Sequence, residues 1–472
     1  MSKIIQFSIL LIFPILITTG AYPNNIDIYF IGIILLLNGI SIISFLFYKE
    51  RFSFLKGQYL KVSYLFLFSL SIVHFQMYVD LILGNIDSQT LFLWINPKIA
   101  ILSLLVSSSA LSSYLLGYTL KYNFKIKKIR ANLKPLKFNF LKTIAILFLL
   151  GFYITVNKQY LVGDYGNTPM GNAALYFSFL FESTICAILI LYARNIIISN
   201  RNISVIDYFN GLKLAYFLLG IYLMGVMMSG DRGPIIFNLL FSLVVFLFVF
   251  KTKFKLSKII IAILIASSFV SLLGIIRSNE GTFFESIQSK NNLINENRYY
   301  PNSFSENTKE LATSARCLNI ATDYVESGGS HTFGLFFIQD VMLLIPSLKG
   351  TVINALDVPK HLTSSPQFLT FLDLGVFATC GVGSTCIADT YLDFGVIGVV
   401  FIFMLFGYIS RYFECLIFSN NLPNFILLAI AFSVFAYSIY IPRSTILYSL
   451  NKVFYIATLI YMVIIINKRK FN

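Results

Sequence analysis

The chain has 472 residues, of which 57% are hydrophobic, 16% are aromatic and only 12% are charged. Soluble domains carry about twice this fraction of charged residues, so the composition excludes a soluble globular protein. The net charge of +15 does not indicate a nucleic-acid partner, because the lysines and arginines gather in short loops between apolar runs, as membrane topology requires.

Apolar runs of about 20 residues, long enough to cross the hydrocarbon core of a bilayer, recur along the whole chain. They predict an all-α, polytopic integral membrane protein, because helices satisfy their own backbone hydrogen bonds in lipid. The first run follows Lys3 and ends in small residues, a form that a signal peptide shares. We keep it as a span and expect about twelve transmembrane helices, at roughly 4–21, 28–47, 62–83, 99–119, 141–157, 173–193, 212–229, 234–250, 257–276, 386–410, 423–441 and 445–466.

The basic residues predict the orientation of these spans. The loop 120–142 has eight lysines and arginines and no acid, so it is expected to face the cytoplasm. Alternation from this loop places 24 of the 36 basic residues on the cytoplasmic side. Both termini are then expected in the cytoplasm, and the longest loop outside.

This topology divides the chain into three regions. Residues 1–276 are expected to form an N-terminal bundle of about nine spans, 277–385 an extracytoplasmic loop, and 386–472 a C-terminal bundle of about three spans. Within the loop, the apolar segment 333–348 contains Asp340. A full span there would reverse every later loop and place the basic C-terminal tail outside, so we expect a re-entrant or interfacial helix.

Four arginines stand where the outer loops meet the membrane: Arg232, Arg277, Arg316 and Arg443. Basic residues are scarce on this side, and arginine presents a planar, permanently charged fork that suits phosphate. We expect the four to converge on one anionic group, with Arg316 the most sensitive to substitution. The alternatives are a solvated turn at Arg232 and interface anchors at Arg277 and Arg443.

Candidate general bases lie in the same loop. They are Asp323, Glu326, Asp340 and His331. Three more ionisable residues lie inside predicted spans, namely His74, Asp80 and Glu182. We expect these three to make structural contacts between helices, and the alternative is the proton relay of a coupled transporter.

Nothing in the sequence indicates a metal or a nucleotide cofactor. The five cysteines have no metal-ligand spacing, and the chain lacks a Walker motif, a Rossmann glycine pattern and a His-Glu-x-x-His motif. No loop on the cytoplasmic side is long enough to fold as a nucleotide-binding domain. We therefore expect no metal site and no cofactor.

The segment 383–398 reads GSTCIADTYLDFGVIG. Its Gly-Ser turn, acidic residue, Thr-Tyr pair and aromatic-Gly pair at the start of a span resemble the C-terminal pattern of Wzy-type O-antigen polymerases. The turn Ser229–Gly233, the Ser-Ala-Arg sequence that ends at Arg316, the Leu-Ile-Pro-Ser sequence 344–347, and Arg443 are similar to the same family. The resemblance covers roughly the second half of the chain, and the first half agrees in hydropathy and in the number of spans. The family pattern has a Glu where this chain has Asp389.

The resemblance implies a membrane-embedded glycosyltransferase of the bacterial inner membrane that polymerises lipid-linked oligosaccharide repeat units into O-antigen or capsule-like polysaccharide. It would transfer the growing glycan from a polyprenyl diphosphate to the non-reducing sugar of the next lipid-linked unit, on the outer face of the membrane. The four arginines would bind the diphosphate, and Asp389 joins Asp323, Glu326 and His331 as a candidate catalytic residue. The implied partners are the lipid-linked substrate, membrane lipid and a chain-length regulator protein.

Two other functions fit a membrane protein of this kind. An O-antigen ligase shares the donor but delivers the glycan to a lipid A core, and the sequence does not reveal the acceptor. A transporter or flippase of lipid-linked sugars predicts two similar halves and a cavity lined with charge. The chain shows no internal repeat and few charges within its spans, so the polymerase is favoured.

Overall fold

The structure is a computed structural model of the chain. It describes residues 12–48, 50, 52–121, 135–162, 170–199, 203–254, 257–259, 303–305, 308–345, 347–378, 381–419 and 424–469. All regular secondary structure in these residues is helical. After helical residues 12–19, the elements are α2 (Ile28–Leu46), α3 (Val62–Ile82), α4 (Leu91–Trp94), α5 (Pro97–Thr119), α6 (Asn139–Thr155), α7 (Lys158–Val162), α8 (Asn172–Ile198), α9 (Val205–Ser229), α10 (Gly233–Phe250), α14 (Lys309–Ala312), α15 (Ala315–Glu326), α16 (Leu335–Met342), α17 (Leu348–Ala355), η2 (Lys360–Leu362), α18 (Ser365–Leu374), α19 (Cys386–Phe418), α20 (Phe425–Tyr437), η3 (Ile441–Arg443), η4 (Ile446–Leu450) and α21 (Val453–Arg469).

Within the described residues, eight helical segments are long and apolar enough to cross a membrane: α2, α3, α5, α8, α9, α10, α19 and the segment Ile446–Asn467. Two further apolar helices, α6 and α20, are shorter. These ten coincide with ten of the expected spans, which confirms an all-helical, multi-pass architecture. Of the other two expected spans, 4–21 is described only from residue 12 on, where 12–19 are helical, and 257–276 only at 257–259, so the total of about twelve stays a prediction.

The helices begin where the sequence supplies capping groups. The Asn96 side chain accepts a hydrogen bond from the Lys98 N–H, and Pro97 occupies the first turn of α5. The Thr385 hydroxyl accepts from the Ala388 N–H at the start of α19. Both arrangements satisfy backbone donors that have no partner within the helix.

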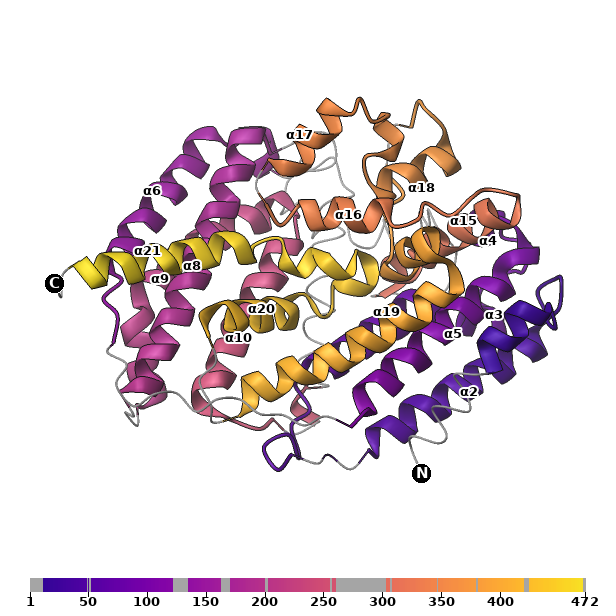
Figure 1. The fold of residues 1–472 in the computed structure, drawn as a ribbon, viewed down its shortest axis with the longest axis horizontal. Coiled ribbons are helices and arrows are strands. Elements are labelled where there is room, and N and C mark those ends of the chain that lie inside the picture. Colours follow the sequence, from indigo (N-terminus) through magenta and orange to yellow (C-terminus); the bar gives the residue numbers. More distant parts are fainter. Residues whose placement is uncertain are drawn as a thin grey trace.

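The packing of α5 against α19 forms the centre of the bundle, and Figure 1 shows the two helices side by side. A Cβ at Gly117 of α5 would collide with the Met404 carbonyl group, and a Cβ at Gly407 of α19 would collide with the Tyr114 carbonyl group. Both backbones can approach this closely because glycine has no side chain at the contact. Small residues at helix interfaces are typical of membrane proteins, in which van der Waals packing drives association.

The outward faces of the long helices are apolar. On α19, Ile397, Phe401 and Leu405 are all well exposed and follow one another at intervals of four residues. This spacing aligns them on one side of the helix. A large exposed apolar stripe is unfavourable in water and favourable against lipid, so its presence supports the membrane assignment.

The ionisable residues within the spans are engaged in structural contacts. Asp80 accepts hydrogen bonds from the Asn85 side chain (2.8 Å), the Ser303 hydroxyl (2.7 Å) and the Phe304 N–H (2.8 Å). Glu182 forms an ion pair with Lys452 and accepts from the Tyr222 hydroxyl at 2.7 Å. The Nδ1 atom of His74 lies 3.4 Å from the Ser107 hydroxyl. These contacts agree with the structural role expected for the three residues.

The helices α15 to α18, in the segment between α14 and α19, lie on one side of the bundle, and α17 and α18 are at the top of Figure 1. The segment 333–348 contains α16, whose eight residues span about 12 Å, before the chain turns and α17 begins. This helix is too short to cross a bilayer core of about 30 Å. Helix α15 packs against α5, α18 and α19, and α16 packs against α19. This segment therefore rests on the same two helices that form the centre of the bundle.

Helix α19 is interrupted at Gly395, whose φ of 65° and ψ of −165° are not helical. Because the helix is broken there, the Leu392 carbonyl is available to accept a hydrogen bond from the Thr332 N–H at 2.9 Å. A Cβ at Gly395 would stand 3.0 Å from the His331 Nε2 atom, so glycine is required for space as well as for backbone conformation. The kink thus joins the first turns of α19 to the loop that precedes α16.

Candidate functional site

Two of the four predicted arginines meet at one carboxylate. Arg232 precedes α10, and its Nη2 atom lies 2.9 Å from the Oε2 atom of Glu310. Arg443 ends η3, and its Nη1 atom lies 3.7 Å from the Oε1 atom of the same residue. The two oxygens of Glu310 therefore face two different arginines, which come from loops about 200 residues apart in the sequence. The arrangement places one carboxylate between two guanidinium groups, and we refer to it below as the anion site.

Arg316 has a different environment. Its Nη2 atom lies 2.6 Å from both carboxylate oxygens of Asp373, and Nη1 donates to the Phe92 carbonyl at 2.5 Å. The guanidinium also stacks on the Phe92 ring, 4.1 Å from its centroid. Arg316 is 12% exposed and Asp373 is 9% exposed. This arginine is thus fixed in a nearly buried ion pair that joins α15 to α18, and Arg277 lies outside the described residues.

A small cavity of about 20 Å³, the size of one water molecule, lies beside the first turns of α19. Its lining includes the carboxyl groups of Asp340, Asp389 and Asp393, with Phe337 of α16 and Thr445. The three acids come from two elements that lie far apart in the sequence. The cavity is therefore a small, mainly apolar space at which three acidic residues converge.

The three carboxylates of the cavity differ in how fully they are hydrogen-bonded. Asp393 accepts from the Thr332 hydroxyl (2.5 Å) and from the N–H groups of Phe336 (3.2 Å) and Phe337 (2.7 Å), so it caps α16. Asp389 Oδ1 accepts from the Ser384 hydroxyl, whereas Asp389 Oδ2 is buried and makes no hydrogen bond. Asp393 thus acts as an anchor, whereas Asp389 has a buried Oδ2 atom without a hydrogen bond and Ser365 near its carboxyl group.

Electrostatics link the cavity to the arginines. Burial raises the pKa of the Asp340 carboxyl group, while the neighbouring Thr445 hydroxyl and the Lys349 charge lower it. Thr445 follows Arg443 by two residues, so their Cα atoms are at most about 7 Å apart. Burial raises the pKa of the Cys317 thiol to about 12, and the charges of Arg443, Asp389 and Arg316 all act on it. One short segment thus contributes Arg443 to the anion site and Thr445 to the cavity.

The other three predicted catalytic residues lie outside the lining of this cavity. Asp323 of α15 accepts a hydrogen bond from the Asn96 side chain at 3.2 Å. Glu326 ends the same helix and is exposed. His331 lies against Gly395 and meets the Tyr391 ring edge to face at 5.8 Å, and its Nδ1 atom is buried without a hydrogen bond. These three residues therefore lie along α15 and the loop after it.

Glu310 is the site residue that sequence reasoning missed. An acid in a long polar loop carries no local signal that it will meet two distant arginines. Ser365, which lies near the Asp389 carboxyl group, gives no signal either. Among the described residues, no group of three or more His, Cys, Asp and Glu side chains is arranged to hold a metal ion.

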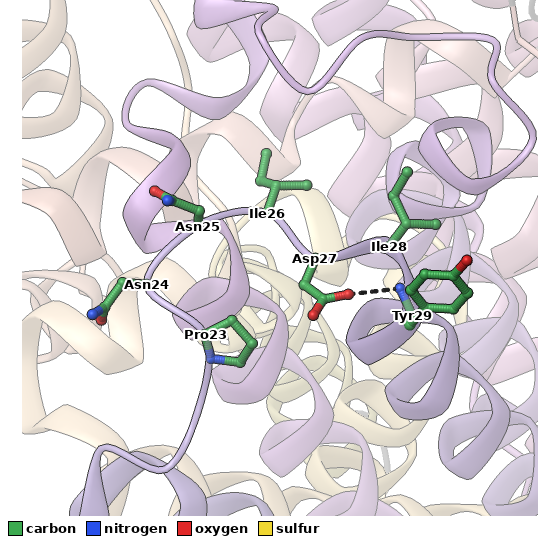
Figure 2. A pocket seen from close by; sticks show the side chains of 7 residues that line it. All are labelled: Pro23, Asn24, Asn25, Ile26, Asp27, Ile28 and Tyr29. Carbon is green, nitrogen blue, oxygen red and sulfur yellow. Dashed lines mark hydrogen bonds between the residues drawn. The ribbon is translucent and has the colours of Figure 1, made fainter.

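A second hollow, lined by Pro23–Tyr29 at the start of α2, has no comparable chemistry. Figure 2 shows its one carboxylate, Asp27, turned toward the start of the helix. Asp27 Oδ1 accepts from the N–H groups of Tyr29 (2.9 Å) and Phe30 (3.2 Å), which is an N-terminal cap. We therefore assign this hollow a structural role.

Comparison with known proteins agrees with the resemblance seen in the sequence. No curated protein and no solved structure matches the chain. The family model described as O-antigen polysaccharide polymerase Wzy matches residues 4–472, which is essentially the whole chain and includes the first half. The match supports polymerisation of O-antigen repeat units, and nothing favours a ligase or a flippase. The chain therefore belongs to the Wzy family of O-antigen polysaccharide polymerases.

Proposed function

We propose that this polymerase uses a polyprenyl-diphosphate-linked donor and carries out the transfer at the outer face of the bacterial inner membrane. The bond between the anomeric carbon of the growing glycan and the diphosphate oxygen breaks. The hydroxyl oxygen of the next lipid-linked unit forms the new glycosidic bond. The hydroxyl proton passes to a carboxylate, and polyprenyl diphosphate leaves as the anion.

The observation that carries this proposal is the meeting of Arg232 and Arg443 beside the carboxylate cavity. A diphosphate leaving group needs charge-assisted donors that are already in place when negative charge develops on it. The acceptor hydroxyl needs a base within hydrogen-bond reach. The short segment that contains Arg443 and Thr445 supports both requirements, because it contributes to both places.

Asp389 is the proposed general base, because its Oδ2 atom is buried and free of hydrogen bonds. Asp340 is its neighbour in the same cavity and is the second carboxylate that we include in the site. For Asp323, Glu326 and His331 we propose a supporting role along the acceptor side, on α15 and the loop after it. We propose that Arg316 holds α15 against α18, and that Arg277, outside the described residues, contributes a further contact to the diphosphate.

We further propose the predicted topology of about twelve spans, with both termini cytoplasmic and three regions, 1–276, 277–385 and 386–472. In this arrangement α16 and α17 form a re-entrant or interfacial cover over the site, and they would exclude water from the reaction. A chain-length regulator is the proposed protein partner. A reporter enzyme fused at Asp357 is expected to report the outer compartment, and one fused at Lys128 the cytoplasm. The reverse pattern would place the site on the wrong side of the membrane.

The base is tested with Asp389→Asn, which keeps the shape and removes the charge. The assay is the length of surface polysaccharide in cells that lack the native gene and express the variant at normal levels. We expect single repeat units to remain and long chains to be lost, because removing a general base costs about 10²–10⁴-fold in rate. Asp357→Asn, the same change at an exposed turn, is the matched control. Normal chains from Asp389→Asn would exclude it as the base.

A further inference from the structure

The anion site between the two arginines is occupied by Glu310, a residue of the chain itself. The ion pair with Arg232 is short, at 2.9 Å, and the contact with Arg443 is longer, at 3.7 Å. Glu310 and Arg443 are also the more open members, with 37% and 35% of their side chains exposed, against 15% for Arg232. One carboxylate thus faces two guanidinium groups, and the cluster of three has an excess positive charge.

The helix that contributes Glu310 is short. Helix α14 has four residues, Lys309–Ala312, and has no side-chain cap at its N-terminus. A single turn of this kind contributes little helical stability of its own. Glu310 can therefore leave the arginines without the loss of a long helix, whereas Arg232 is fixed at the start of α10.

We propose that Glu310 is an internal competitor for the diphosphate site: it binds Arg232 and Arg443 in the empty protein, yields to the donor's diphosphate, and returns to displace the spent polyprenyl diphosphate. The inference rests on the proposed function of the two arginines. A carboxylate presents two anionic oxygens to an arginine fork, as a phosphate group does. Because the donor and the spent carrier share the diphosphate, arginines without a competitor would hold both tightly, and tight ground-state binding does not speed the reaction.

The test uses the full-length protein purified in detergent, with farnesyl diphosphate as the probe and its dissociation constant as the measurement. We expect Glu310→Gln to bind the probe about tenfold more tightly than the wild type, because the competing ion pair and a like charge are both removed. Glu310→Asp keeps the charge on a shorter side chain and is expected to lie between the two. Asp357→Asn, which removes a charge at an exposed turn, is expected to bind like the wild type.

In cells, the same change should slow release of the spent carrier, so Glu310→Gln is expected to give fewer long chains at a normal protein level. Unchanged or weaker probe binding by Glu310→Gln would overturn the proposal, since it would make Glu310 a support for the arginines. Equal thermal midpoints of wild type and variant would show that folding does not account for the difference.

The arginine variants separate this inference from the function on which it rests. Arg232→Ala and Arg443→Ala are expected to weaken probe binding both in the wild type and in the Glu310→Gln background. If neither arginine variant weakens binding, the proposed diphosphate site is wrong. If both weaken it while Glu310→Gln leaves binding unchanged, the diphosphate site stands and only the role of Glu310 is wrong.

Discussion

Two arginine clusters of this protein have the same chemical groups and opposite arrangements. Arg316 has a carboxylate of its own, with both oxygens of Asp373 at 2.6 Å, and the pair is nearly buried. Arg232 and Arg443 share the single carboxylate of Glu310, and two members of that cluster are more than one-third exposed. In the first arrangement one positive charge is balanced by one negative charge, whereas in the second two guanidinium groups share one carboxylate and two of the three side chains are partly exposed.

Under the proposed function, this difference separates a structural arginine from a binding arginine. Nearness to a membrane boundary, which selected all four arginines in the sequence, does not distinguish them. The ratio of positive to negative groups and the exposure of the cluster do distinguish them, because a buried one-to-one pair has no charge left for a substrate. Substitutions should therefore act on catalysis at one site and on stability at the other.

The largest expected effect is that of Arg232→Ala on the rate of polymerisation. Loss of one charge-assisted donor to a leaving group costs about 10²–10³-fold in rate. We expect long chains to disappear while the amount of protein in the membrane stays normal, as measured by polysaccharide gels and quantitative blotting. Lys360→Gln, which removes an exposed positive charge in η2, should leave chain length unchanged.

Arg316→Ala should act instead on stability. Removing one partner of a nearly buried ion pair strands the other charge and costs about 3 kcal/mol in the free energy of unfolding. We expect a lower thermal midpoint in detergent and less protein in the membrane, and Asp373→Ala should have the same effect. If Arg316→Ala were normal in both measurements and yet lost long chains, Arg316 would belong with the binding arginines.

The smallest expected effect concerns the acidic limb of the pH–activity profile. We expect activity to need an ionised Asp340 in the cavity, so it falls as the pH drops through the pKa of this carboxyl group. Burial raises the pKa of Asp340, and the Lys349 charge lowers it. Lys349→Met removes the lowering charge, so the pKa rises further and the acidic limb should move to higher pH by about half a unit.

The measurement is polymerisation by purified protein across a pH series, and Lys360→Met is the matched control at an exposed lysine. If the acidic limb of the profile stays in place in the Lys349→Met variant, Asp340 does not need to be ionised for activity. A limb that moves to lower pH would contradict the sign of the argument.

Much of the fold was predictable because lipid imposes a strong constraint on the sequence. The apolar runs at 99–119 and 386–410 predicted the two helices that form the centre of the bundle, α5 and α19. Their contact through Gly117 and Gly407 was not predicted, because a glycine in an apolar run does not indicate which helix will pack against it. The kink at Gly395 also depends on a distant residue, His331, and needed the structure.

The candidate site was predicted only in part from the sequence. Scarcity of positive charge on the outer side drew attention to Arg232 and Arg443, and the motif at 383–398 drew attention to Asp389. Pairing is a property of three-dimensional contacts, so the sequence did not distinguish Arg316, held by Asp373, from the other arginines. Glu310 was missed because its partners lie far from it along the chain.

The most direct test of the central claim, that Arg232 and Arg443 act as one anion site, is a double-mutant cycle on the rate of chain elongation. Arg232→Ala, Arg443→Ala and the double variant are compared with the wild type at equal protein levels. Residues that act as a unit are strongly non-additive, so we predict that the double variant loses little more than the worse single variant. Losses that multiply, or a normal rate in either single variant, would contradict the account.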